Sequence, residues 1–216
     1  MRKVLTAALV LVLSLALAGC SALLPGSGFG GRPVHQSPMA AFWDAVNRQS
    51  SSGGSLMPGT VQVVTSAAVD ADHYVVLFTG QDRGGGPGTG GVMNILGVYN
   101  IERDSRLGWQ ARSGGWGGSS GVLPATAPAV GMGASTGGTG LNYMTIYGEV
   151  NDPNVAEVEA VLKDGTSIRQ SVPAGQKGYL IIAPQHSAPH HVVARDKTGK
   201  VLFDGGAGGG ASPATP

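Results

Sequence analysis

The chain has 216 residues and a nearly balanced charge, with 14 Lys and Arg against 13 Asp and Glu and a formal net charge of +1 at pH 7. Nucleic-acid binding depends on clustered basic side chains that neutralise phosphates, and the few, scattered basic residues of this chain exclude that class of partner. Its single cysteine, Cys20, excludes an internal disulfide, and a single long apolar run excludes a transporter or channel.

The N-terminus carries the pattern of an export signal. Arg2 and Lys3 form a basic start, and residues 4–17 are a run of Val, Leu and Ala interrupted only by one Thr and one Ser. A helix that crosses the ~30 Å hydrocarbon core of a bilayer needs ~20 apolar residues, so this run is short for a permanent membrane span. We therefore expect residues 1–19 to be a signal peptide that is removed.

The apolar run ends in Leu17-Ala18-Gly19-Cys20. This tetrapeptide resembles the lipobox of bacterial lipoprotein precursors, in which the Cys thiol receives diacylglycerol and a signal peptidase cleaves just before it. The resemblance covers the first twenty residues and implies that Cys20 becomes the acylated, palmitate-bearing N-terminus of a lipoprotein. Two or more acyl chains, at ~0.8 kcal/mol per buried CH₂, hold a protein stably to a bilayer. The resemblance thus implies a protein anchored to the lipid bilayer through Cys20 rather than one that spans it.

The same resemblance predicts the location of the protein, which is the cell membrane or the outer membrane, lipid-anchored and facing the extracytoplasmic side. Ser21, in place of Asp, resembles the outer-membrane default of hosts with two membranes. Two alternatives are an ordinary secretory signal whose cleavage site ends in Cys and a buried free thiol at Cys20.

The segment after the signal predicts a tether and then a helix. Residues 20–36 are rich in Gly, Pro and Ser and predict a flexible tether, with an end-to-end distance on the order of 20 Å. Residues 37–58 contain a short helix and a linker, with Ser37 as N-cap, Pro38 as the first helical residue, and apolar spacings of three and four up to about Arg48. We expect this amphipathic helix to pack on the domain. The alternative, a helix lying on the membrane, has only one basic residue in its support.

From residue 59 the pattern changes to strands. A first β region covers residues 59–121, and its Val and Thr content predicts strands over 60–69, 73–79, 92–102 and 107–112. Residues 113–140 show no sustained periodicity and are interpreted as a loop that includes a Gly/Ala/Pro-rich linker over 122–140.

A second β region covers residues 141–204. Its expected strands are 143–150, 155–162, 167–172, 179–183, 192–195 and 200–203. Together the two regions predict a mainly β fold of antiparallel, sandwich-like halves with one short N-terminal amphipathic helix. Halves of roughly 60 residues are marginal alone, so we expect them to pack together. The second half is similar to small β domains of uncharacterised secreted bacterial proteins, a resemblance that carries no functional residues.

Glycine is unusually frequent. The chain has 37 glycines among its 216 residues, whereas glycine makes up ~7% of an average protein. Because glycine loses the most backbone entropy on ordering, its clusters predict flexible segments. These clusters are residues 26–31, 84–91, 114–121, 131–140 and 205–210. The tail over 205–216 is expected to be disordered.

Two glycine motifs match known site patterns, and we interpret both as chance matches. Residues 117–121 fit the nucleophile elbow G-x-S-x-G, but Pro124 and Pro128 oppose the helix that must follow it. Residues 86–91 fit the dinucleotide-binding G-x-G-x-x-G, but a strand-like run follows in place of a helix.

His186, His190 and His191 form the one local group of potential metal ligands in the sequence. A structural zinc site normally needs four ligands held by further hydrogen bonds, and no cysteine is free to complete this group. The three histidines are therefore weak candidates for a metal site. Their main interpretation is as polar loop residues, and we expect no cofactor.

Two acidic pairs are candidates for catalytic carboxylates. Glu157 and Glu159 alternate with Val158 on an expected strand, so both face one side, as on a solvated sheet face. Glycoside hydrolysis instead needs carboxylates on opposite sides of a cleft. Asp70 and Asp72 lie in an expected turn, where their side chains cap the backbone.

Tyr99, Trp109 and Trp116 could form an aromatic platform, which makes Trp109 and Trp116 the candidate ligand-binding aromatics. Core packing is the alternative. It suits Tyr99 and Trp109 better than Trp116, which lies among glycines.

Together these patterns predict a membrane-anchored extracytoplasmic lipoprotein that acts as a binding or structural module of the cell envelope, without catalysis. Its expected partners are the lipid bilayer, through acylated Cys20, and an envelope protein or saccharide. A secreted hydrolase and a metal-binding envelope protein are the alternative functions.

Overall fold

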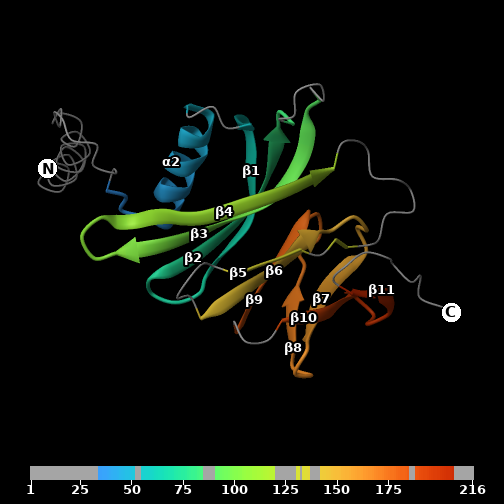
Figure 1. The fold of residues 1–216 in the computed structure, drawn as a ribbon. Coiled ribbons are helices and arrows are strands. Elements are labelled where there is room, and N and C mark those ends of the chain that lie inside the picture. Colours follow the sequence, from blue (N-terminus) through green and yellow to red (C-terminus); the bar gives the residue numbers. More distant parts are fainter. Residues whose placement is uncertain are drawn as a thin grey trace, which may run out of the picture. The chain divides into compact units, whose positions relative to one another are not determined.

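The computed structural model describes residues 34–51, 55–84, 91–119, 130–131, 133–136, 142–184 and 188–206. These residues belong to one unit of the chain, Pro33–Pro216, and form one helix and eleven strands in three antiparallel sheets (Figure 1). The predicted mainly β fold with one short helix is therefore confirmed. Among these residues, no helix combines the length and the apolar character that a membrane crossing requires.

Helix α2 covers Pro38–Ser51 and begins where the sequence predicts. The backbone N–H of Ala40 donates to Ser37 Oγ at 3.2 Å, which is the expected N-cap hydrogen bond. The helix continues beyond the predicted end at Arg48 because no Pro or Gly interrupts it before Gly53. The side chains that it buries against the first sheet are Ala41, Phe42, Ala45 and Val46.

The first sheet has the strand order β1-β2-β3-β4, with all neighbouring strands antiparallel. Its strands are β1 Leu56–Ala68, β2 His73–Asp82, β3 Met93–Asp104 and β4 Gly108–Ser119. Successive side chains of β2 point to opposite faces of the sheet, and both faces are covered. Val76 and Phe78 pack toward α2, whereas Val75 and Leu77 pack on the other side. Since both faces are buried, this stretch of β2 is apolar throughout instead of alternating with polar residues.

The prediction of a loop over 113–140 is wrong for residues 113–119, which belong to β4. Residues 113–119, most of them in the glycine cluster expected to be flexible, continue β4 and pair with β3. An aromatic ring explains Gly114, because a Cβ at this position would lie 2.6 Å from Tyr99 Cδ1. A Cβ on Gly97, in β3, would likewise lie 2.6 Å from Phe78 Cζ. These glycines are thus packing positions under rings.

The second β region forms two sheets. The second sheet has the order β11-β10-β7-β8 and the third sheet the order β5-β6-β9. Their strands are β5 Gly133–Thr136, β6 Tyr143–Glu149, β7 Val155–Leu162, β8 Ser167–Ser171, β9 Gly178–Pro184, β10 Pro189–Asp196 and β11 Val201–Gly206. The strands predicted from residue 143 onward are confirmed to within a few residues.

Two parts of this region differ from the sequence prediction. Strand β5 and a bridge between Val130 and Val150 lie within or border the predicted linker over 122–140. Small residues pair with β6 through their backbones there, so they leave no apolar periodicity to detect. Strand β11 includes Gly205 and Gly206 of the predicted disordered tail, because their backbones pair with β10.

Three apolar clusters hold the layers together. The first lies between α2 and the first sheet, and the second joins the other face of the first sheet to the third sheet. The last cluster lies between the third and second sheets. Strand β9 shows this arrangement, because Leu180 belongs to the second cluster while Tyr179 and Ile181 belong to the last. The predicted halves therefore share an interface, with the third sheet between the other two.

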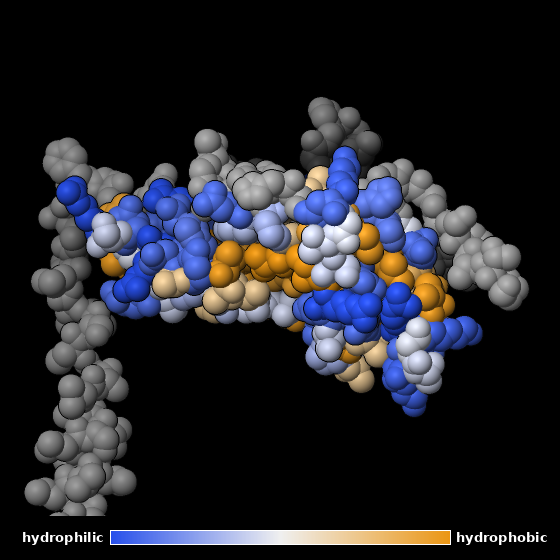
Figure 2. Space-filling view, turned by 90° about the horizontal axis from the view of Figure 1, so that it is seen from below, coloured by the Kyte–Doolittle hydropathy of each residue, from blue (hydrophilic) through white to orange (hydrophobic). Residues whose placement is uncertain are grey.

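Apolar residues gather in a band across the face of the molecule shown in Figure 2, with polar residues on both sides.

Glycine lets the first and third sheets approach closely, since a Cβ on Gly178 would lie 3.1 Å from Leu77 Cδ2. The partly buried apolar residues that extend the interface between these sheets are Val64, Ala67, Val69, Tyr147 and Ile182.

Candidate functional site

The candidate site forms where β1 leaves its regular pairing with β2. Met57 pairs with Gln81, but the next pair along the strands is Gln62 with Thr79. The β1 residues between these pairs therefore form a bulge opposite Gly80, the single β2 residue between the same pairs. A bulge of this kind interrupts the regular hydrogen-bond ladder between the two strands.

Thr60 holds the bulge in place. Its Oγ1 donates to the carbonyl oxygen of Met57 at 2.7 Å and accepts from the backbone N–H of Gln81 at 2.8 Å. Pro58 favours the irregularity because it has no N–H to donate to the ladder. A Cβ on Gly80 would lie 3.3 Å from Val61 Cγ2 and 3.6 Å from Thr60 Oγ1, so glycine at this position lets the bulged segment of β1 lie close to β2.

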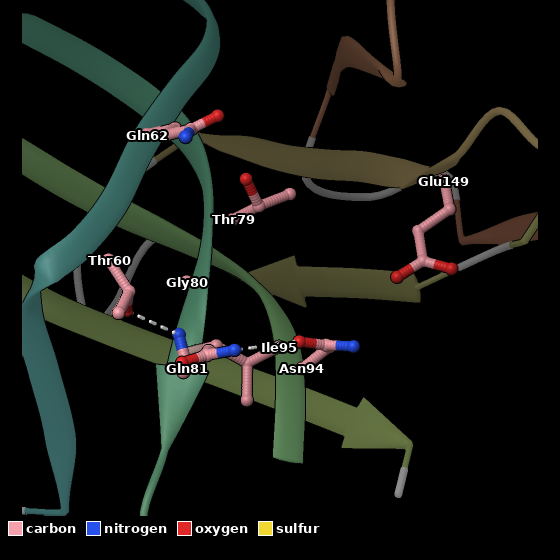
Figure 3. Close-up of a pocket in the computed structure, with 8 residues that line it drawn as sticks. All are labelled: Thr60, Gln62, Thr79, Gly80, Gln81, Asn94, Ile95 and Glu149. Atoms are coloured by element: carbon pink, nitrogen blue, oxygen red, sulfur yellow. Dashed lines mark hydrogen bonds between the residues drawn. The ribbon is translucent and has the colours of Figure 1, made fainter. Parts of the chain in front are cut away.

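A polar hollow of about 510 Å³ lies beside the bulge (Figure 3). Most of its lining comes from β1, β2 and β3, whereas Glu149 comes from the end of β6 in the third sheet. The lining residues are Thr60, Gln62, Thr79, Gly80, Gln81, Asn94, Ile95 and Glu149. The polar hollow therefore lies where the first and third sheets meet.

The lining is neutral apart from one carboxylate. Hydroxyl and amide groups predominate, and none of the described residues that line the polar hollow is basic or aromatic. Gln81 Nε2 donates to Asn94 Oδ1 at 3.5 Å, which is a long hydrogen bond. Within the described part of the chain, the side chains of Gln62, Thr79 and Glu149 have no hydrogen-bond or ion-pair partner. The polar hollow thus presents hydrogen-bonding groups that the protein itself does not use.

A second polar group lies on the same face of the first sheet, but its members bond to one another. The Tyr143 hydroxyl donates to Asn100 Oδ1 at 3.3 Å, and Asn100 Nδ2 donates to Ser113 Oγ at 3.1 Å. Burial raises the pKa of Tyr143 to about 12, and the nearby carboxylates of Asp70 and Glu102 add to the rise. This chain of bonds joins the third sheet to the first and has a structural role.

The turn between β1 and β2 confirms the predicted role of Asp70. Its Oδ1 accepts hydrogen bonds from the backbone N–H groups of Asp72 and His73, both at 2.8 Å. The bond from Asp72 is the main reason that the pKa of Asp70 is lowered. His73 Nδ1 also lies 2.8 Å from Asp70 Oδ1. The carboxylate thus caps the backbone of the turn.

Glu157 and Glu159 lie on one face of β7, as predicted, but Glu159 is not solvated. Arg169 lies 3.7 Å from Glu157 and 3.3 Å from Glu159, and Arg195 lies 3.3 Å from the second oxygen of Glu159. Glu159 is 7% exposed. Its burial, which alone would raise the pKa, is outweighed by a hydrogen bond from Ser167 and by the two arginines, so the pKa of Glu159 is lowered. These carboxylates form an ion-pair network.

The three candidate aromatics come together beneath α2. Tyr99 is 5% exposed and stacks on Phe78 with ring centroids 5.6 Å apart. Trp109 and Trp116 are partly buried against the same apolar cluster. Trp116 Nε1 also donates to Asp82 Oδ2 at 2.6 Å. This arrangement supports the core-packing alternative for all three side chains.

Two of the three candidate metal ligands lie on β10. The rings of His190 and His191 have centroids 5.0 Å apart, and His191 Nε2 lies 3.6 Å from Asp204 Oδ1. His186 lies outside the described residues. Among the residues that are described, no three His, Cys, Asp or Glu side chains are grouped so that they could hold a metal ion.

The sequence motifs are only partly within the described residues. Residues 117–119 of the G-x-S-x-G motif lie in β4, where Ser119 pairs with Asn94. Within the described residues, Ser119 is thus the last residue of a strand that pairs with β3. Residues 86–90 of the G-x-G-x-x-G motif lie outside the described part of the chain, as does the lipobox with Cys20.

Sequence reasoning missed the residues of the polar hollow. One signal is present on β2, where Val75 and Leu77 face the third sheet but Thr79 and Gln81, on the same face, are polar. That change shows where the apolar interface ends. The approach of Glu149 from β6 has no local signal, because it depends on how two sheets pack.

Compared with protein-family models, with curated proteins and with solved structures, the chain matches none.

Proposed function

We propose that the protein is a lipid-anchored module of the cell envelope whose β body binds a ligand in the polar hollow. The unused polar side chains of Gln62, Thr79 and Glu149 are the observation that carries this proposal. By contrast, Tyr143 and Asn100 bond to each other inside the protein. A ligand would supply the hydrogen-bond partners that the polar hollow lacks.

The lining supports recognition over the secreted-hydrolase alternative. Glu149 is the one ionisable side chain among the lining residues. Glycoside hydrolysis needs two carboxylates, and acyl transfer needs a nucleophile with an adjacent base. The polar hollow offers neither pair, whereas single carboxylates and amides are common in binding sites.

The anchoring part of the proposal rests on the sequence. The lipobox resemblance at Leu17-Ala18-Gly19-Cys20 supports acylation of Cys20, and the Gly/Pro/Ser-rich segment that follows supports a flexible tether. Such an anchor would hold the β body near the extracytoplasmic surface of a membrane. Many copies on one membrane could then bind one polymeric ligand together, which raises the effective strength of a weak site.

Photo-crosslinking tests ligand binding in the polar hollow. A photo-crosslinking amino acid replaces the exposed Gln62 in the full-length protein, in cells that produce it. The matched control carries the same amino acid at Lys163, which is exposed in the turn after β7. We expect a crosslinked envelope component at position 62 and none at position 163. Equal crosslinking at the two positions, or none at either, would contradict the proposal.

Fractionation of producing cells tests the anchor. We expect the wild-type chain and the tether variant Ser27→Ala to sediment with membranes, because both keep the cysteine of the lipobox. The variant Cys20→Ala should lose the lipid and should not be processed at this position. If Cys20→Ala is still found in the membranes as a processed protein, the anchor is not the proposed one.

A further inference from the structure

We infer that the polar hollow recognises an uncharged saccharide. The inference rests on the proposed function, because it names the ligand class of the same site. The unused groups are an amide at Gln62, a hydroxyl at Thr79 and a carboxylate at Glu149. Amides and hydroxyls both donate and accept hydrogen bonds. The hydroxyl groups of a sugar do the same, so they match this lining better than a ligand that only donates or only accepts.

Glu149 gives the site a strong acceptor on one side. Figure 3 shows its carboxylate extending from β6 toward the space that Thr79 and Asn94 border on the first sheet. Hydrogen bonds to an ionised carboxylate are roughly twice as strong as neutral ones. Two neighbouring hydroxyls of one sugar can each donate a hydrogen bond to one oxygen of the Glu149 carboxylate. We therefore assign Glu149 to hydroxyl binding, with the first-sheet amides and the Thr79 hydroxyl on the opposite side of the sugar.

The same lining disfavours other classes of ligand. An anionic ligand would lie beside Glu149 with no lining Lys or Arg to offset the two negative charges. An apolar ligand would contact Ile95 but would leave the polar groups unpaired. An amine could pair with Glu149, but it would leave the Thr79 hydroxyl and the amide N–H groups without acceptors. A neutral sugar satisfies both sides of the polar hollow.

The size and composition of the polar hollow indicate a weak site for part of a longer glycan. Its volume of about 510 Å³ lies within the range of about 300–1,000 Å³ found for small-molecule sites. No aromatic ring among the described residues lines it, since Trp109 and Trp116 pack beneath α2. Without ring stacking, we expect a Kd on the order of 1 mM for a single site. Exposed Gln62 and Asn94 leave room for a glycan chain to continue past the site.

Calorimetric titration of the full-length protein in detergent micelles tests the inference. The probes are the neutral hexasaccharides of maltose, cellulose and N-acetylated chitin type, with hexagalacturonate as an anionic probe and trilysine as an amine probe. We expect at least one neutral hexasaccharide to bind and the other two probes not to bind. Glu149→Gln and Thr79→Val should each weaken binding by about tenfold, which corresponds to the loss of one hydrogen bond.

The matched control is Glu157→Gln, on the second sheet, which should bind the sugar as the wild type does. Thermal unfolding of each variant shows that it is folded, and Thr79→Val, which keeps the side-chain shape, separates loss of a hydroxyl from loss of structure. The inference is overturned if none of the neutral hexasaccharides binds, or if trilysine binds and loses affinity in Glu149→Gln. If crosslinking at position 62 persists in either case, the site still binds a ligand and only its assignment as a saccharide falls.

Discussion

The glycines of β4 provide a sharp test of the packing under α2. Gly114 pairs with Tyr99 across β3 and β4, and the next residue, Gly115, pairs with Val98. A Cβ at Gly114 would lie 2.6 Å from both Cδ1 and Cε1 of Tyr99, whereas a Cβ at Gly115 would have nothing within 4 Å. Gly114→Ala and Gly115→Ala are therefore adjacent, chemically identical changes with opposite expected effects.

The magnitude follows from what holds the Tyr99 ring. Ordinary carbon contacts lie at about 3.5–4.0 Å, so the ring has to move by roughly 1 Å to admit a methyl group at Gly114. Phe78 and Phe42 oppose that movement, with ring centroids 5.6 Å and 5.7 Å from that of Tyr99. Overpacking of this kind costs about 1–3 kcal/mol, which lowers the Tm of a domain of this size by roughly 2–12 °C.

Thermal and urea unfolding of the full-length protein in detergent measure this difference. Gly115→Ala should be neutral or should gain about 0.4–1 kcal/mol, because Ala restricts the unfolded chain more than Gly does. Gly114→Ala should be less stable than both Gly115→Ala and the wild type. The reasoning is refuted if Gly114→Ala is as stable as Gly115→Ala, since the residues 113–119 would then not pair beneath the ring.

Three further predictions concern titration and capping. Because the folded pKa of Glu159 is lowered from 4.5, its ion pairs with Arg195 and Arg169 should stabilise the protein above pH 4.5 and be lost as the pH falls through the folded pKa. Urea unfolding against pH should therefore show a smaller acid loss in Glu159→Gln. The pKa of Tyr143 is raised from 10.0 to about 12, so the contribution of Tyr143 to the free energy of unfolding should be lost as the pH rises from 10 to 12. Tyr143→Phe should cost about 1–2 kcal/mol at neutral pH, because it loses the hydrogen bond to Asn100, and should not show this alkaline loss. Urea unfolding of both proteins at pH 7 and pH 11 measures the two effects. Ser37→Ala should cost about 1 kcal/mol by thermal unfolding, with Ser37→Asp retaining the cap.

The elements with their own periodic signal were predictable from the sequence. Ser37 and Pro38 indicate the start of α2, and the Val-rich and Thr-rich runs indicate most of the strands. The glycine cluster in β4 favoured a flexible loop instead. For Gly114 the reason for the glycine lies in Tyr99 on the neighbouring strand and not in its own segment. Strand β5 has no signal of its own, since its small residues pair through the backbone with β6.

The candidate site was less predictable than the fold. Carboxylate pairs and aromatic residues in the sequence indicate Glu159, which forms ion pairs within the protein, and Trp116, which packs against the apolar cluster beneath α2. The polar hollow consists mainly of neutral residues that become neighbours through the β1 bulge and the packing of two sheets. Neither the bulge nor the approach of Glu149 is encoded within a short stretch of sequence.

The intact mass of the protein extracted from membranes of producing cells is the most direct test of the anchored binding module. We predict a chain that begins at Cys20 and carries the added mass of diacylglycerol, as the lipobox resemblance implies. A chain that begins elsewhere, or one with an unmodified thiol at Cys20, would contradict the account.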